Sequence, residues 1–188
     1  MDQVEQAITS RTKAICVVHY LGLPVDMSRV NQLAQKFSLF VVEDAALAVG
    51  ARFRGIHTGL LGDAASFSFY PVKHITTAEG GMFTTRDPLI AEKVSRLKAF
   101  GYDKMLGERA TPGLYDVNKL GYNYRMNELE AALGIQQLKR LDNFLSQRHS
   151  NNSALRKALE DITEFSPLSD GGGDFEHSHY CLVGVLND

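Results

Sequence analysis

Residues 14–44, AICVVHYLGLPVDMSRVNQLAQKFSLFVVED, decide the fold of this chain. The apolar runs at its two ends, 14–18 and 39–42, have the length and composition of strands that are buried on both faces. Between them, Asp26 is placed to cap a helix, and apolar residues recur at the i, i+3, i+4, i+7 spacing of one helical stripe over residues 30–37. A strand, a helix and a strand within about 30 residues predict a βαβ unit with two parallel strands.

The rest of the chain carries the alternation of strand and helix signals that an α/β fold requires. Asp87, followed by a proline, predicts the start of a second helix. Asn127 resembles the first residue of a capping box with Glu130, and a long helical pattern follows it to Leu159. We therefore predict an α/β fold with a mainly parallel sheet flanked by helices. The other expected segments are strands at 51–55, 64–69, 81–85 and 180–186, a functional or disordered loop at 101–122, and a flexible link at 169–174.

Composition excludes several classes of protein. The 188 residues are 44% hydrophobic and 22% charged, which is typical of a globular chain, and the net charge of −2 lacks the basic excess of a nucleic-acid binder. No apolar run is long enough to span a bilayer, so we expect no membrane segment. Cys16 and Cys181 each lie in an apolar run and have no zinc-site spacing, which predicts two buried thiols in a reducing compartment. We expect a cytoplasmic protein.

Chemistry is expected where two of the predicted strands end. Asp44 ends a buried strand, and ligands bind at the carboxyl ends of strands in parallel α/β sheets. Ser66 and Ser68 alternate onto one face of the strand at 64–69, and Lys73 follows that strand. Pyridoxal 5′-phosphate (PLP) needs a lysine, an anion beside its pyridine nitrogen and small donors for its phosphate. An ordinary surface lysine is the alternative reading of Lys73.

Several motifs, in this order, resemble the signature of the DegT/StrS family. They are Glu43-Asp44-Ala45-Ala46, Gly62-Asp63, Ser66-Phe67-Ser68-Phe69-Tyr70-Pro71-Val72-Lys73, Thr77-Ala78-Glu79-Gly80-Gly81 and Gly121-Tyr122-Asn123-Tyr124-Arg125-Met126-Asn127-Glu128. Members of this family are PLP-dependent sugar aminotransferases with the aspartate aminotransferase type of fold. The resemblance runs from about Thr12 to the last expected strand, which is nearly the whole chain. It implies the large domain of a PLP-dependent transferase, with PLP as the cofactor.

The resemblance also assigns roles to single residues. Lys73 would be the catalytic lysine that binds PLP covalently and then shuttles a proton, and Asp44 would pair with the pyridinium nitrogen. Ser68 would hold the phosphate, and Asn123 would reach the phosphate of the neighbouring subunit in a homodimer. For Asn123 the alternative is a loop residue that bonds its own backbone. Arg125 would contact a substrate carboxylate or phosphate, with a structural ion pair as the alternative.

The chain departs from the family pattern in three respects. Leu47 stands where a glutamine or histidine is frequent, and it cannot donate a hydrogen bond to the cofactor ring. Lys73 is retained, whereas a related branch of dehydratases has histidine there, so transamination is favoured. The family pattern also extends before Thr12 and beyond residue 188, so we expect an internal fragment with weak cofactor binding. Residues 1–146 would then be part of the large domain, and residues 147–188 the interdomain helix and the start of a small C-terminal α+β domain.

Two functions remain open from the sequence. The first is transfer of an amino group, from glutamate as the expected donor, to a nucleotide-linked keto sugar for lipopolysaccharide, other polysaccharide or antibiotic amino sugars. The second is an inactive fragment or a non-catalytic binding or assembly module. Asp44, Ser68 and Lys73 together favour the enzyme. His177 and His179 could offer two metal ligands, but no third ligand is apparent, so we predict no metal site.

Overall fold

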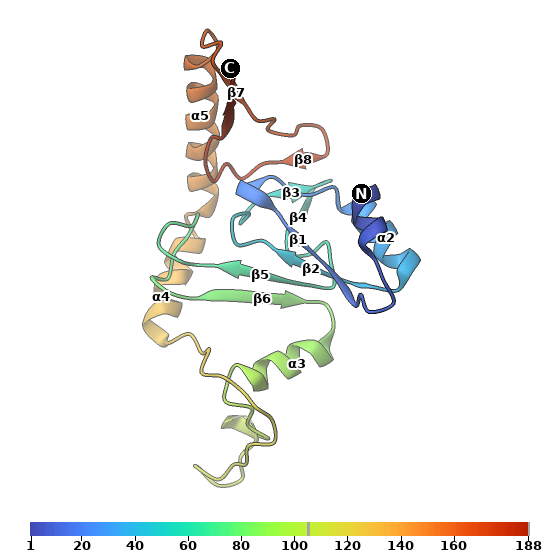
Figure 1. Cartoon of the computed structure of the whole chain (residues 1–188). Helices are drawn as coiled ribbons and strands as arrows, with labels where there is room; N and C mark the ends of the chain where they lie inside the picture. The colour runs from blue at the N-terminus through green and yellow to red at the C-terminus, as the bar shows by residue number, and fades with distance from the viewer. Residues whose placement is uncertain (105, 188) are drawn as a thin grey trace.

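The computed structural model describes residues 1–104 and 106–187 of the chain. Its central sheet has four strands in the order β1-β2-β5-β6, in which β1, β2 and β5 are parallel neighbours and β6 is antiparallel to β5 (Figure 1). The predicted α/β class and the mainly parallel sheet are therefore confirmed. The strands of this sheet are β1 (Ala14–Val18), β2 (Phe40–Asp44), β5 (Ala64–Ser68) and β6 (Gly81–Thr85).

The βαβ unit forms where the sequence predicts it. Helix α2 (Met27–Phe37) joins β1 to β2, and the Asp26 side chain caps it by accepting a hydrogen bond from the backbone N–H of Arg29. The helix ends at Ser38, which adopts the left-handed conformation typical of a C-cap. The buried residues of α2 are Met27, Val30, Leu33 and Ala34, whereas Phe37, at the end of the predicted stripe, is exposed. The core around α2 contains Val17, Met27, Val30, Ala34, Val41 and Phe53.

Short strands outside the central sheet differ from the sequence prediction. The strand expected at 51–55 is divided into β3 (Arg52–Phe53) and β4 (Ile56–His57), a hairpin with a tight turn between them. The link at 169–174 leads directly into β8 (Phe175–Glu176), which pairs with β3 across more than 120 residues of sequence. The last expected strand is shorter than predicted, because only β9 (Gly184–Leu186) pairs, with β7 (Phe165–Pro167).

Helices surround the sheet and extend beyond it. The long helix expected after Asn127 is two helices, α4 (Glu128–Leu138) and α5 (Leu141–Ala158), which follow each other along one side of the molecule (Figure 1). The segment between α3 and α4 projects away from the sheet as an arm. No helix in the described part of the chain is long and apolar enough to cross a membrane. The remaining helices are α1 (Asp2–Ala7), α3 (Pro88–Leu97) and the 3-10 turns η1 (Tyr20–Gly22) and η2 (Leu106–Glu108).

The thiols are not buried as predicted. Cys16 and Cys181 are both exposed. On β1 only Val17 is fully buried, because α2 covers the face onto which Val17 points and Cys16 points to the opposite face. The prediction was wrong because an apolar run was read as buried on both faces, whereas β1 buries one.

Removal of the α4 cap should weaken the protein by a measurable amount. The Asn127 side chain accepts a hydrogen bond from the backbone N–H of Glu130, and the Glu130 carboxylate accepts one from the backbone N–H of Asn127, so the predicted capping box is confirmed. We expect Asn127→Ala to lower the free energy of unfolding by about 1 kcal/mol in urea titrations. Asn151→Ala, at an exposed position inside α5, is the control and should change it by no more than a few tenths of a kcal/mol.

Candidate functional site

Asp44 lies at the carboxyl edge of the parallel strands, as the sequence predicts. It is the last residue of β2 and is flanked in register by Val18 on β1 and Ser66 on β5. One carboxylate oxygen of Asp44 accepts a hydrogen bond from the backbone N–H of Ala46 (3.0 Å). The other oxygen has no hydrogen-bond partner within residues 1–104 and 106–187. The half-buried carboxylate is therefore free to pair with a donor that is brought to this edge.

Glu43, the neighbour of Asp44, is completely buried and fixes the end of β2. Its carboxylate accepts four hydrogen bonds, one from the His19 ring and three from the backbone N–H groups of Gly59, Leu61 and Gly62, at 2.6–2.9 Å. Four donors match the four acceptor sites of a carboxylate. Burial alone would raise the pKa of Glu43, but the hydrogen bonds from His19, Gly59 and Gly62 outweigh it, so the pKa is lowered.

His19 links this carboxylate to Asp44. Its Nδ1 accepts a hydrogen bond from the backbone N–H of Val25 (3.1 Å), so the proton is on Nε2. The Nε2–H group donates a hydrogen bond to the Glu43 carboxylate (2.9 Å). The backbone N–H of His19 donates to the carbonyl oxygen of Asp44 (3.0 Å). Since side chains alternate along a strand, the anchored Glu43 directs Asp44 to the opposite face of the sheet.

Lys73 lies in a tight loop that begins at the end of β5. Its backbone N–H donates to the carbonyl of Tyr70, whose own N–H points at the Ser68 hydroxyl at 3.4 Å. The Lys73 ammonium has no acidic partner within ion-pairing distance in the described part of the chain. It lies instead over the ring of Tyr180, 5.5 Å from the ring centre. The Lys73 side chain is half-buried.

His74 ties this loop to the C-terminal segment. Its Nε2 donates to the carbonyl oxygen of Ser178 (3.0 Å), so its buried Nδ1 carries no proton, and Nδ1 has no hydrogen-bond partner within the described residues. Burial and the nearby guanidinium of Arg148 lower the pKa of His74 to about 4. A proton on Nδ1 would place an uncompensated charge in this buried position.

Stability should therefore fall when the pH drops below neutrality. His74 is protonated near its ordinary pKa of 6.5 in the unfolded chain but only near 4 in the folded one. The folded state loses up to roughly 3 kcal/mol relative to the unfolded state as the pH falls through this window, and nothing further from His74 below it.

We expect urea titrations of the wild-type protein to give a lower free energy of unfolding at pH 4.5 than at pH 7.5. The variant His74→Gln, which keeps a donor for the Ser178 carbonyl, should show a smaller decrease. His177, whose pKa burial and the neighbouring His179 also lower to about 4, titrates in the same window in both proteins. The prediction fails if the two proteins lose equal stability between these pH values.

Asn123 and Arg125 lie apart from this loop, near the end of α3. Asn123 is exposed and forms a β-bridge with Ala99, and the Arg125 guanidinium stacks on the ring of Phe100 at 4.7 Å. Arg125 has no ion pair in the described residues. The structure thus brings Asp44, Ser68 and Lys73 to one edge of the sheet and places the other two beside the arm.

An acidic side chain, that of Asp170, lies beside the two C-terminal histidines. The ligand atoms of Asp170, His177 and His179 lie within 4.8 Å of one another, a group that the sequence does not reveal. However, the Asp170 carboxylate is already bonded to Arg156 and Asn152, and Nδ1 of His177 accepts the backbone N–H of His179 (2.7 Å). In that tautomer the other nitrogen of His177 carries the proton. The hydrogen bonds therefore describe a structural network in the C-terminal segment.

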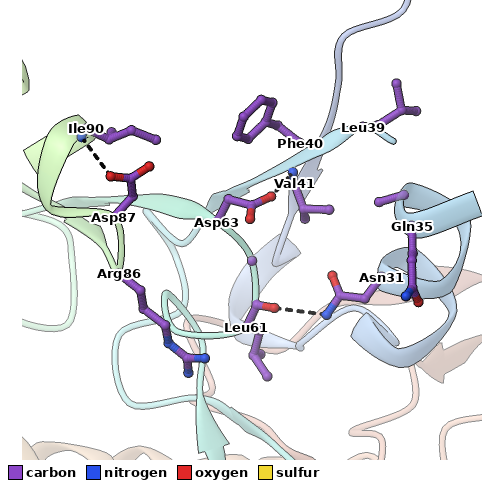
Figure 2. Close-up of a pocket in the computed structure, with 12 residues that line it drawn as sticks. Asn31, Gln35, Leu39, Phe40, Val41, Leu61, Asp63, Arg86, Asp87 and Ile90 are labelled. Carbon is purple, nitrogen blue, oxygen red and sulfur yellow. Dashed lines mark hydrogen bonds between the residues drawn. The ribbon is translucent and has the colours of Figure 1, made fainter. Parts of the chain in front are cut away.

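A separate cavity opens at the opposite, amino edge of the sheet (Figure 2). It has a volume of about 630 Å³ and is lined by α2, the start of β2, residues 61–63 just before β5, and the first turn of α3 with the two residues before it. Several of its polar side chains already bond within the fold: Asn31 donates to the carbonyl of Leu61, Asp63 accepts the N–H of Val41, and Asp87 accepts the N–H of Ile90. The ligand rule for parallel sheets favours the edge of Asp44 and Lys73.

The residues at the Asp44 edge fit the three requirements of PLP. An ammonium without an acidic partner, a carboxylate with an uncommitted oxygen and a strand-end hydroxyl come from Lys73, Asp44 and Ser68. Sequence reasoning gave no role at this edge to Glu43, His19, His74 or Tyr180, which lie around these groups. His19 could have been found by the rule that selected Asp44, because it directly follows β1. The position of Tyr180 depends on long-range packing and left no signal.

Comparison with known proteins identifies the family of this chain. A family model described as the DegT/DnrJ/EryC1/StrS aminotransferase family matches residues 1–188. GDP-perosamine synthase of Escherichia coli O157:H7 is 37% identical over 186 residues, which are 99% of this chain and 48% of the relative. The spore coat polysaccharide biosynthesis protein SpsC of Bacillus subtilis is 40% identical over 163 residues, 85% of this chain and 42% of the relative.

Solved structures of aminotransferases superpose on this chain. The aminotransferase TlmJ from Streptoalloteichus hindustanus superposes with a TM-score of 0.91 at 28% identity, covering 99% of this chain and 49% of that one. Spr1654 from Streptococcus pneumoniae, in a PLP form, superposes with a TM-score of 0.82 at 28% identity, covering 95% and 49%. This chain thus spans about half the length of the proteins it matches, and PLP is the cofactor of the group. The chain belongs to the DegT/DnrJ/EryC1/StrS family of sugar aminotransferases.

Proposed function

We propose that this chain carries the cofactor site of a PLP-dependent aminotransferase that moves an amino group from an amino acid, glutamate, to a nucleotide-linked keto sugar. The product would be an amino sugar for lipopolysaccharide, another polysaccharide or an antibiotic. Membership of the family supports this proposal, and so do relatives that are named for perosamine and for spore coat polysaccharide biosynthesis.

Each residue has a role that its surroundings support. When bound, PLP supplies an electron sink that lets the proton on the substrate carbon beside nitrogen be removed. Lys73 would hold the cofactor and then carry that proton on its Nζ, and Asp44 would offer its uncommitted oxygen to the pyridine nitrogen. Ser68 would bind the phosphate. The exposed Asn123 and Arg125 would act from the arm, across the interface of a homodimer and on a substrate anion respectively.

The observation that carries the proposal is the environment of the Lys73 ammonium. Lys73 is half-buried and has no acidic partner in the described residues, so no ion pair occupies its ammonium. It follows β5 at the same edge of the sheet at which β2 ends in Asp44. An amine held at a ligand edge without a counter-ion is suited to covalent chemistry.

The organisation of the whole protein is part of the proposal. Residues 1–146 would belong to the large domain, and residues 147–188 to the interdomain helix and the start of a small domain, a division that falls inside α5. We propose a homodimer that acts in the cytoplasm. Sedimentation velocity of the purified protein measures the oligomeric state directly.

Reductive trapping tests the cofactor site. The protein is mixed with stoichiometric PLP, reduced with borohydride, digested and mapped by mass spectrometry. We expect one pyridoxyl label, on Lys73, while exposed lysines such as Lys98 and Lys139 stay unlabelled. Labels scattered over exposed lysines, or none, would reject the cofactor site and favour the binding or assembly module.

A further inference from the structure

The residues that surround the Lys73 ammonium point to a role for the C-terminal segment. Tyr180, 107 positions further along the chain, presents its ring 5.5 Å from Nζ of Lys73, and that ring also lies 5.8 Å from the His74 ring. An ammonium within about 6 Å of an aromatic centre is attracted to the ring face. Within the described residues no carboxylate pairs with the Lys73 ammonium, and the Tyr180 ring contacts it instead.

Tyr180 is held firmly from three directions. Its backbone N–H donates to the carbonyl of Leu21 (3.2 Å), and its carbonyl accepts from Arg148 of α5 (3.1 Å). Ser178, two residues earlier, accepts from the ring of His74 (3.0 Å). The backbone that carries the Tyr180 ring is therefore bonded to η1, to α5 and, through Ser178, to the Lys73 loop.

The backbone before Tyr180 is also in an unusual conformation. His179 has φ +50°, in the left-handed region that residues other than glycine rarely adopt. Arg148 donates to the carbonyl of His179 (3.2 Å) as well as to that of Tyr180, and so holds this conformation in place. A strained residue that is fixed by surrounding bonds is typical of a functional position.

We infer that Tyr180 is a positioning residue for Lys73, whose ring face holds the Nζ ammonium at the carboxyl edge of the sheet. This inference rests on the proposed function. A free lysine side chain samples many rotamers, and a ring that attracts its charged form reduces that freedom. Once its bond to the cofactor is broken, Lys73 must carry the proton taken from the substrate on its Nζ. The ring of Tyr180 stabilises this protonated form and keeps it near the reacting atoms.

Nuclear magnetic resonance of the cofactor-free protein tests the contact without any reaction. With lysine labelled at Cε, we expect one upfield-shifted Hε signal, caused by the ring current of Tyr180 and assigned by its loss in Lys73→Arg. The shift should persist in Tyr180→Phe and disappear in Tyr180→Leu. Tyr70→Leu, which alters another tyrosine of the same loop, is the matched control and should keep it. A shift that persists in Tyr180→Leu would overturn the inference.

Steady-state kinetics of the PLP-loaded protein then test the role. Tyr180→Leu should lower kcat about two- to fivefold with KM unchanged, and Tyr180→Phe should restore kcat. A raised KM with normal kcat would mean that Tyr180 contacts substrate and would overturn the inference. Failure of the proposed function is distinguishable, because reductive trapping would then leave Lys73 unlabelled in the wild-type protein. Thermal unfolding of each variant verifies that it folds.

Discussion

Lys73→Arg is expected to abolish covalent attachment of PLP and to slow amino transfer by roughly 10²–10⁴-fold, the range that proton transfer by a positioned side chain contributes. Arginine keeps the positive charge and can still lie over the Tyr180 ring, as Lys73 does. Its guanidinium neither forms the bond to PLP nor gives up a proton near neutral pH. The measurement combines reductive trapping with the rate of amino transfer.

Stability separates this loss from misfolding. Lys73 has no ion pair in the described residues, so Lys73→Arg should unfold within about 0.5 kcal/mol of the wild-type protein. Lys98→Arg, at an exposed position, should leave both label and rate unchanged. A variant at Lys73 that still takes up the label at another single lysine would show that the covalent site had been misassigned.

The parts of the fold that the sequence predicts correctly are those set by local pattern. The strand–helix–strand unit depends on two apolar runs of strand length, on a 3.6-residue periodicity and on the cap at Asp26, all of which lie within 31 consecutive residues. The position of Asp44 follows from the same unit, because it ends the second strand. The capping box at Asn127 is equally local and forms as predicted.

The parts that could not be predicted depend on partners far away in the chain. Strand β8 is two residues long and has no periodicity, so only its pairing with β3 defines it. The division between α4 and α5 occurs without the glycine or proline that marks most breaks, at Lys139 and Arg140. The donors that surround Glu43 include three backbone N–H groups, which every residue except proline offers and which therefore leave no trace in sequence.

Glu43→Gln is expected to destabilise the protein by about 3–5 kcal/mol, the cost of breaking a buried ionic hydrogen-bond group. The wild-type carboxylate accepts one pair of donors on each oxygen: His19 and Gly59 on one, Leu61 and Gly62 on the other. A glutamine turns one of these oxygens into an NH₂ group, which cannot accept. The two buried N–H groups that bonded to this oxygen then lose their acceptor and face the NH₂ group of the glutamine.

Urea titration measures this loss, and the matched control is Glu5→Gln. Glu5 pairs with Lys36 at the surface, where their side chains are 42% and 62% exposed, so its replacement should cost no more than about 1 kcal/mol. The pH dependence identifies the cause, because hydrogen bonding lowers the pKa of folded Glu43 below its ordinary value of 4.5. The wild-type advantage over Glu43→Gln should therefore be complete above pH 4.5 and shrink as the pH falls below it. An advantage that stayed constant down to pH 3 would mean that shape, and not the charged acceptor, fixes the end of β2 beside Asp44.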